Sequence, residues 1–314
     1  MKHLILMPLF LFAFSAFAES EETHIENELC KVYGTLDWSG NPETAQPLVI
    51  LIAGSGPTDR NGNNPQMKNN SLKLFSEMLV AEGYACLRYD KRGIAKSQLP
   101  KDYDNKNHSF DGFIEDAKLW VEKYAADVRF NQIILCGHSQ GSLVAMCAAN
   151  GNENVDGVIS LAGAGERIHE VLKKQLAVQL SVEMQGLVNA KLDTMAMGDT
   201  LVEAPKMLHS IMHPSIQPFL ISWMKYDPVK QIKALKVPIL LVNGTTDIQV
   251  KLDQLNKLAE AQPEATVAKI KNMNHVLKFI KSEDMGEQVE LYGDPDEPLH
   301  KKLSKPVFKF LSQF

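Results

Sequence analysis

The chain has 314 residues, of which 45% are hydrophobic and 23% are charged, and its formal net charge is −5. This length allows one large α/β core or two small domains. The acidic balance excludes a typical nucleic-acid-binding protein, because a phosphate backbone would repel the chain and no basic segment with interleaved aromatic residues is present.

The N-terminus has the pattern of a secretory signal peptide. Lys2 is followed by an apolar stretch over residues 4–14 and by the small-residue ending Ala16-Phe17-Ala18. We expect cleavage of residues 1–18 before Glu19 and a periplasmic or secreted protein without a stable membrane anchor. An uncleaved anchor is the weaker alternative, because the apolar run is shorter than the roughly 20 residues that span a bilayer. No cysteine lies near the cleavage site, which disfavours a lipid anchor.

Strand and helix patterns alternate along the remaining chain. Short apolar segments predict strands at 29–38, 48–53, 84–89, 133–136, 155–161, 237–243 and 266–270. Apolar residues at helical spacing predict helices near 71–79, 113–124, 252–261 and 298–314. Such alternation builds a mostly parallel, doubly wound sheet with helices on both faces. We expect one α/β domain over residues 19–314.

About 60 residues interrupt the alternation. Residues 163–226 show only helical patterns, with breaks at glycine and proline, and this is far longer than an ordinary connection between strands. We interpret them as a helical cap. The cap is rich in methionine, which either lines an adaptable substrate pocket or packs the cap helices together; the second alternative is favoured for any single residue. These residues are Met184, Met195, Met197, Met207, Met212 and Met224.

A G-x-S-x-G pentapeptide with Ser139 at its centre follows the apolar run 133–136. A strand that turns sharply into a helix at this serine would push its hydroxyl out above the sheet, and the flanking glycines would avoid a collision of Cβ atoms. Ser139 is therefore a candidate nucleophile. The pentapeptide alone is a weak signal, so the assignment of Ser139 as nucleophile depends on other residues of the chain.

Two companions follow in the order typical of a catalytic triad. Asp247 lies on the loop after the strand at 237–243, and His275 lies shortly after the strand at 266–270. The carboxyl ends of parallel strands meet at one edge of a sheet, so these side chains are expected near Ser139. A serine hydroxyl needs a base during attack, and the base needs a carboxylate that fixes its tautomer. His275 and Asp247 suit these two roles.

Two further motifs resemble one group of enzymes. An apolar strand is followed by the loop Gly54-Ser55-Gly56-Pro57-Thr58-Asp59-Arg60-Asn61-Gly62-Asn63. The second motif is Asp90-Lys91-Arg92-Gly93, followed by Ser97. With the Ser, Asp and His order, the chain resembles the α/β-hydrolase superfamily, and within it bacterial esterases and serine-aminopeptidase-like hydrolases with a G-S-G-P-x-D-R-x-G loop. Two positions depart from the pattern: no H-G-G-G run is present, and Ala95 replaces a frequent glycine.

The resemblance implies an α/β-hydrolase fold with a helical cap and a site that needs no cofactor or metal. One oxyanion donor would be the N–H of Gln140. The second would be the N–H of Ser55, with Gly56 as the alternative; Pro57 has no N–H. We expect hydrolysis of a small carboxylic ester through an acyl-Ser139 intermediate. Aminopeptidase or amidase activity, thioester hydrolysis or acyl transfer remain alternatives, and a non-catalytic binding module is less favoured. The oligomeric state stays open.

Several other residues are interpreted structurally. Asp59 and Arg60 are expected to pair and shape their loop, with contact to the substrate as the alternative, and Asp90 and Arg92 are expected to brace loops. His138 is expected to be structural. Weak metal patterns at His209 and His213, and at Asp294, Asp296 and Glu297, are set aside in favour of structural or solvated roles. Cys86, Cys136 and Cys147 are expected to be buried free thiols, because they lie in apolar strands and in the helix after Ser139. In the sheet that the resemblance implies, the 48–53 strand also separates the strands of the first two.

Overall fold

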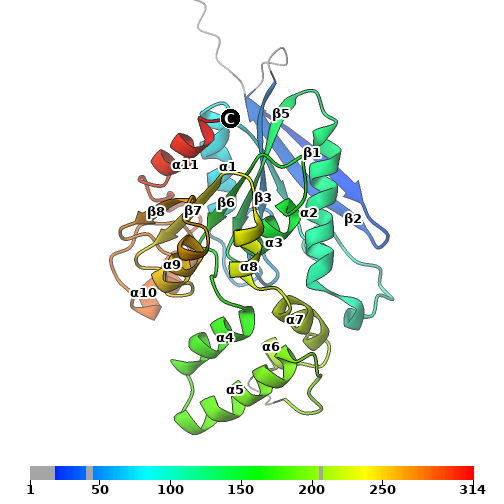
Figure 1. Cartoon of the computed structure of the whole chain (residues 1–314), viewed down its shortest axis with the longest axis vertical. Helices are drawn as coiled ribbons and strands as arrows, with labels where there is room; N and C mark the ends of the chain where they lie inside the picture. Colours follow the sequence, from blue (N-terminus) through cyan, green and yellow to red (C-terminus); the bar gives the residue numbers. More distant parts are fainter. Residues whose placement is uncertain (1–17, 40–44, 205–207) are drawn as a thin grey trace, which may run out of the picture.

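A computed structural model describes residues 18–39, 45–204 and 208–314. Its centre is an eight-stranded sheet with the order β1-β2-β4-β3-β5-β6-β7-β8 (Figure 1). The strands are β1 (Ala18–Glu26), β2 (Lys31–Ser39), β3 (Gln46–Ile52), β4 (Ala85–Tyr89), β5 (Phe130–His138), β6 (Gly157–Leu161), β7 (Ile239–Gly244) and β8 (Thr266–Ile270). The β1/β2 and β2/β4 pairs are antiparallel, and the remaining pairs are parallel.

Helices cover both faces of the sheet. On one face the core includes residues of α1 (Ser71–Ala81) and α11 (Ser304–Leu311). On the other face it includes residues of α2 (Phe110–Ala125), α3 (Gln140–Ala149), α8 (Pro228–Ala234) and α9 (Leu252–Ala261). The central strands are buried on both faces, as their nearly continuous apolar sequences predict. The α/β fold expected from the alternating patterns is therefore confirmed.

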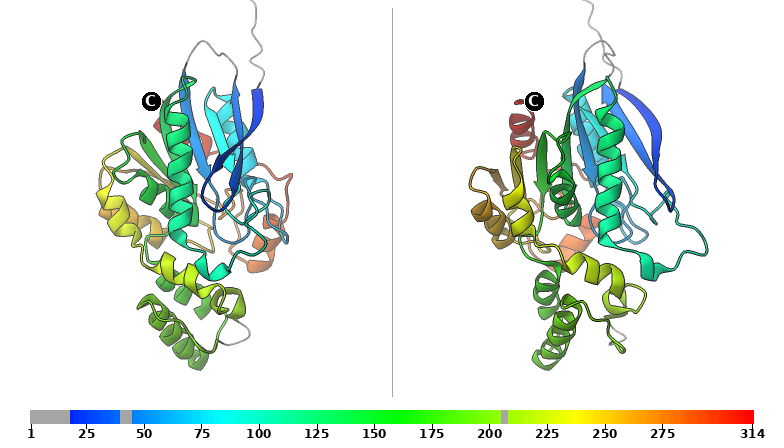
Figure 2. Two further views of the ribbon diagram at one scale, coloured as in Figure 1. Left: turned by 90° about the vertical axis from the view of Figure 1, so that its right-hand side faces the viewer. Right: turned by 45° about the vertical axis from the view of Figure 1, so that its right-hand side comes forward.

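The long segment between β6 and β7 forms a separate helical layer. It contains α4 (Ile168–Ala177), α5 (Val182–Ala196), α6 (His209–Met212) and α7 (Gln217–Met224), which lie together at one end of the sheet (Figures 1 and 2). This cap has a core of its own, in which Met195, Met212 and Met224 are buried. Met197 is exposed, and Met207 lies outside the described residues. Three methionines therefore pack cap helices together.

Some elements differ from the sequence-based expectation. Strand β1 was not expected, because its sequence is polar and only Thr23 and Ile25 are buried in it. Helix α10 (Met285–Tyr292) and a short 3-10 turn (Asn105–Asn107) were also missed, and the closing helix is shorter than residues 298–314. Residues 1–17 of the expected signal peptide 1–18 and most of the expected turn at 39–42 lie outside the described residues. No helix in the described part of the chain is long and apolar enough to cross a membrane.

The prediction that Asp59 pairs with Arg60 is wrong. The guanidinium of Arg60 pairs with Asp90 at 2.7 Å, and Asp59 instead accepts the backbone N–H groups of Asn61 and Asn63. Arg92 forms two hydrogen bonds of 2.7 Å with Asp116 of α2, so Asp90 and Arg92 do brace loops. The side chains of both pairs are buried. Removal of one partner would leave an unpaired buried charge and strongly destabilise the fold.

The four cysteines are free. Strand β3 lies between β4, which contains Cys86, and β5, which contains Cys136. Both side chains and that of Cys147 are buried. The expected strand order and the expected buried thiols are thus confirmed.

Candidate active site

Ser139 lies at a sharp turn between β5, which ends at His138, and α3, which begins at Gln140. Its backbone has φ 53° and ψ −118°, a left-handed conformation that is unusual for a residue with a side chain. A Cβ atom at Gly137 would come within 2.0 Å of the carbonyl of Gly141, and one at Gly141 would come within 2.2 Å of the carbonyl of Ile52. Both glycines are therefore required by the close backbone contacts that the turn imposes.

His275 and Asp247 form a buried pair on two neighbouring segments. Asp247 follows β7, and His275 follows β8 after a turn. The Nδ1 atom of His275 and the Oδ2 atom of Asp247 are 2.8 Å apart, and both residues are less than 5% exposed. The other carboxylate oxygen of Asp247 accepts the N–H groups of Gln249 and Val250. Asp247 is thus held in place, and it fixes the proton of His275 on Nδ1.

His138 connects the serine turn to the histidine loop. Its Nε2 atom is 2.8 Å from the carbonyl oxygen of His275, and the two imidazole rings have centroids 4.8 Å apart. Burial lowers the pKa of His138 to about 4, so the ring is neutral at pH 7 and donates from Nε2. The expected structural role of His138 fits this contact, which holds the His275 backbone against the residue that precedes Ser139.

Within the described part of the chain, the hydroxyl of Ser139 has no hydrogen-bond partner. The bond to His275 that activation requires is therefore not formed here. Such bonds are often loose in ligand-free structures and shorten when substrate binds. The structure brings the three expected residues to one edge of the sheet, at the carboxyl ends of β5, β7 and β8.

The 54–63 loop lies directly beside Ser139. A Cβ atom at Gly54 would lie only 3.3 Å from the Cβ of Ser139, and Ser55 and Gly56 line the same cavity as Ser139 and Gln140. Gly56 has φ 71°, which favours glycine. The carbonyl of Ser55 accepts the hydroxyl of Thr58 at 2.8 Å. The backbone of all three expected oxyanion residues, Gln140, Ser55 and Gly56, is thus gathered next to the serine.

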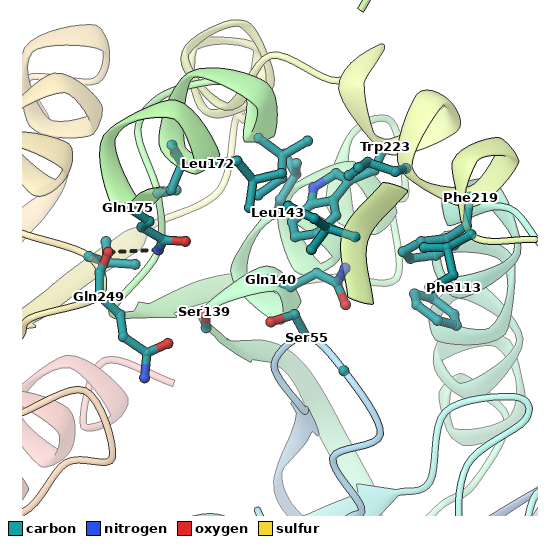
Figure 3. A pocket seen from close by; sticks show the side chains of 18 of the residues that line it. Ser55, Phe113, Ser139, Gln140, Leu143, Leu172, Gln175, Phe219, Trp223 and Gln249 are labelled. Carbon is teal, nitrogen blue, oxygen red and sulfur yellow. Dashed lines mark hydrogen bonds between the residues drawn. The ribbon is translucent and has the colours of Figure 1, made fainter. Parts of the chain in front are cut away.

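A cavity of about 520 Å³ opens between the cap and the sheet at this point. Figure 3 shows Ser139 and Gln140 at its floor, with Leu143 beside them and Phe113 and Phe219 at one end. Most of its lining is apolar and comes from the cap and from α2 and α3: Phe113, Leu143, Ile168, Val171, Leu172, Ile211, Ile216, Phe219, Leu220 and Trp223. No described methionine lines it, so the less favoured alternative of a methionine-lined pocket is not observed there.

Glu166 is the single carboxylate among the described residues that line the cavity. Its oxygens accept hydrogen bonds from Lys174, Lys257 and Gln254. Burial alone would raise its pKa, but the two lysines outweigh this effect and lower the pKa to about 2. Its negative charge is thus compensated within the protein, and the cavity offers little attraction to a cation.

Two polar groups in the cavity wall lack partners within the described structure. Gln140 is 5% exposed, and neither its Oε1 nor its Nε2 atom has a hydrogen-bond partner. His108 stacks on Phe219 with ring centroids 5.1 Å apart, and its Nδ1 atom is also unpartnered. Burial and two nearby cations lower the pKa of His108 to about 4, so its ring is neutral. The cavity is therefore uncharged apart from Glu166.

Sequence reasoning did not single out Lys91, His108 or Glu166. Lys91 stands inside a recognised motif, but the motif does not reveal which way its side chain points. His108 and Glu166 lie in a loop and at the edge of the cap, and nothing in their local sequence signals a cavity. Only the fold reveals the buried side chain of Lys91 and the buried, unpartnered Nδ1 atom of His108.

The weak metal patterns remain without support. His209 and His213 lie with ring centroids 5.4 Å apart, and His213 contacts Ser215. Asp294 accepts the N–H groups of Asp296 and Glu297, as expected of a polar loop. Among the described residues, His169, Glu170 and Asp193 form the one cluster compact enough for a metal. The ammonium of Lys173 already contacts both of its carboxylates.

The fold and the site define the protein as an α/β hydrolase. Its sequence matches the family model described as "Serine aminopeptidase, S33" over residues 69–279, which is about two thirds of the chain. The chain therefore belongs to this family of α/β hydrolases. A search of curated protein sequences found no significant match.

Solved structures with the same fold include several esterases. An esterase of Pyrococcus furiosus is 16% identical, with a TM-score of 0.59 over 94% of this chain and 90% of its own. Est1E of Butyrivibrio proteoclasticus, solved with ferulic acid bound, is 16% identical, with a TM-score of 0.62 over 92% of this chain and 99% of its own. A dienelactone hydrolase of Anabaena variabilis is 15% identical, with a TM-score of 0.54 over 95% and 98% of the two chains. At such low identity these similarities establish the fold alone.

Proposed function

We propose that the protein is a serine hydrolase that cleaves carboxylic esters with Ser139 as nucleophile. His275 takes the hydroxyl proton during attack, and Asp247 stabilises the imidazolium that forms. The backbone N–H of Gln140, together with that of Ser55 or Gly56, binds the oxyanion. His275 then protonates the leaving alcohol, and water hydrolyses the acyl-Ser139 intermediate. The single observation that carries the proposal is the strained serine turn at the floor of a cavity, beside the 2.8 Å His275–Asp247 pair.

The cavity favours an ester over a peptide substrate. An aminopeptidase must bind a positively charged α-amino group, and a free carboxylate is the usual partner for such a cation. Among the described lining residues the one carboxylate is Glu166, which two lysines and Gln254 already engage. The remaining lining is largely apolar and suits an uncharged acyl or alcohol group. The esterases among the structural neighbours agree with this choice but do not decide it.

A comparison of substrates tests this proposal. Purified protein is assayed with p-nitrophenyl esters of graded acyl length, with the matching thioesters and with aminoacyl p-nitroanilides, and Ser139→Ala serves as the inactive control. We expect the highest kcat/KM with an ester whose acyl group is uncharged. A higher kcat/KM with the aminoacyl anilides would identify a peptidase and reject the esterase proposal.

We also propose that the protein is exported. The support is the signal-like segment at residues 1–18, and cleavage there would leave a chain that begins with Glu19, within β1. The test is the N-terminal sequence of protein isolated from periplasm and medium after expression of the full chain in a bacterium. Glu19 at the N-terminus is expected. Full-length protein retained in the cytoplasm would contradict export.

A further inference from the structure

Lys91 is a lysine buried behind the candidate oxyanion loop. It follows β4 and is 2% exposed. Its ammonium donates hydrogen bonds to the backbone carbonyls of Gly54 and Gly56, the second at 3.2 Å. Its Nζ atom also lies 5.4 Å from the centroid of the Phe113 ring. Lys91 therefore connects the end of β4 with the loop that borders Ser139.

The surroundings of Lys91 differ from those of the other buried cations near it. Among the described residues Lys91 forms no salt bridge, whereas three buried arginines each pair with a carboxylate: Arg60 with Asp90, Arg88 with Asp37 and Arg92 with Asp116. A buried ammonium without a counter-ion is unfavourable, and burial lowers the pKa of Lys91 to about 7. A merely space-filling role would be served better by an apolar side chain of the same length.

The geometry of the peptide bond explains what the contact does. In a trans peptide the C=O of one residue and the N–H of the next point in opposite directions, and the described chain has no cis peptide bond. The carbonyl of Gly54 points at Lys91, so the N–H of Ser55 points away from Lys91. Ser55 borders the cavity beside Ser139, and Lys91 does not line that cavity. The N–H of Ser55 is thereby turned to the side on which the substrate would lie.

The second carbonyl contact fixes the other end of the same turn. The Gly56 carbonyl belongs to the peptide of Pro57, which has no N–H, so this contact holds the loop without orienting a donor. The Gly56 N–H is controlled separately, because its peptide partner, the carbonyl of Ser55, accepts the Thr58 hydroxyl. Lys91 thus acts on the Ser55 donor in particular.

We propose that Lys91 is a positioning residue for the oxyanion hole, which turns the N–H of Ser55 toward the carbonyl oxygen of the group attacked by Ser139. The inference rests on the proposed function of Ser139. It also selects Ser55 over Gly56 as the donor that Lys91 orients. Lys91 does not touch the substrate and takes part in no proton transfer.

The test is Lys91→Met, which keeps the length of the side chain and removes the ammonium. We expect kcat to fall about 10²-fold to 10³-fold, as on loss of one oxyanion donor, while KM changes less than about threefold. The affinity for an alkyl boronic acid, whose serine adduct places an oxygen in the oxyanion hole, should fall in parallel with kcat/KM. The Kd of an unreactive ether analogue should stay unchanged. All rates are normalised to the concentration of folded protein, which is measured by circular dichroism.

Lys123→Met is the matched control. Lys123 on α2 also donates to a backbone carbonyl, that of His24, and to the hydroxyl of Thr23. Its loss removes a lysine–carbonyl contact elsewhere in the fold and should leave kcat and boronic acid affinity unchanged. Lys91→Gln is the second variant at the site, because its shorter uncharged amide can still donate to one carbonyl. We expect it to keep more of kcat than Lys91→Met does.

Two results would overturn the inference. One is a folded Lys91→Met, or a folded Lys91→Gln should Lys91→Met not fold, with kcat within about threefold of the wild type. The other is a loss of ether-analogue affinity equal to the loss of boronic acid affinity, which would indicate general damage to the cavity. Failure of Ser139 as the nucleophile is distinguishable, because the wild-type protein would then neither hydrolyse esters nor bind the boronic acid.

Discussion

The Nδ1 atom of His275 lies 2.8 Å from the Oδ2 atom of Asp247, and both side chains are buried. The partners of Asp247 leave it little freedom, because the backbone of the same loop binds its second oxygen. Such a carboxylate holds a neutral imidazole with its Nε2 lone pair free to accept a proton. This pair is the most completely formed part of the candidate site.

Asp247→Asn should therefore inactivate the protein without unfolding it. The amide can present N–H where the carboxylate accepted one, and this favours the wrong histidine tautomer. We expect kcat for a p-nitrophenyl ester to fall about 10³-fold to 10⁴-fold with a small change in KM. Asp253→Asn, at an exposed carboxylate on α9, is the matched control and should keep wild-type kcat. Wild-type turnover in Asp247→Asn would assign His275 a different partner.

Gln140→Met should stabilise the protein. Both polar atoms of the Gln140 side chain are buried without partners, and an unpaired buried polar group costs about 1–3 kcal/mol. Methionine has a similar volume and no such requirement, and it leaves the backbone N–H in place. We expect the free energy of unfolding in urea to rise by about 1 kcal/mol. A decrease would mean that the amide is already paired in the free protein.

Stability should fall on acidification between pH 6.5 and 4. Burial lowers the pKa values of His138 and His108 to about 4, whereas unfolded histidine titrates near 6.5. In this range the unfolded state binds protons that the folded state does not, so the free energy of unfolding decreases as the pH falls. The slope is at most about 1.4 kcal/mol per pH unit for each histidine.

His108→Phe tests this origin of the acid sensitivity. Phenylalanine keeps the aromatic contacts with Phe113 and Phe219 and does not titrate. Urea unfolding of both proteins at several pH values between 4 and 7 should show a shallower slope for the variant. Identical slopes would show that His108 does not contribute.

Thiol reactivity should be confined to one cysteine. Burial raises the pKa values of Cys86 and Cys147 to about 12 and that of Cys136 well above its usual value, so these thiols are neither accessible nor ionised at neutral pH. Cys30 is partly exposed. We expect the native protein to react with one equivalent of an aromatic disulfide reagent, at Cys30, and with four after denaturation. A disulfide in unreduced native protein would contradict the free thiols.

The sequence predicts the site better than its surroundings, for a physical reason. Ser139, Asp247 and His275 each lie shortly after a parallel strand, and parallel strands bring such positions to one edge. Strands β5 and β7 are largely buried, whereas β8 is an edge strand of which only Ile270 is buried. The turn at Ser139 needs glycine at defined offsets, which the sequence displays directly. Ala95 replaces a glycine that is frequent in related sequences, and its φ of 45° is a conformation that favours glycine.

Contacts between distant segments could not be predicted in this way. Adjacent Asp59 and Arg60 do not pair, because the loop carboxylate binds local N–H groups and Arg60 reaches Asp90 across the sheet edge. Strand β1 was missed because an edge strand with few buried residues lacks a strong hydrophobic pattern. The role of Lys91 depends on the direction of a single carbonyl, which no sequence pattern reveals.

The most direct test of the proposed nucleophile is its reaction with a fluorophosphonate, followed by mass spectrometry of the labelled peptide. We predict one phosphonyl group per folded molecule, located on Ser139, and no labelling of Ser139→Ala, whose far-UV circular dichroism should match the wild type. Folded wild-type protein that does not react, or that is labelled at a residue other than Ser139, would contradict the proposed mechanism.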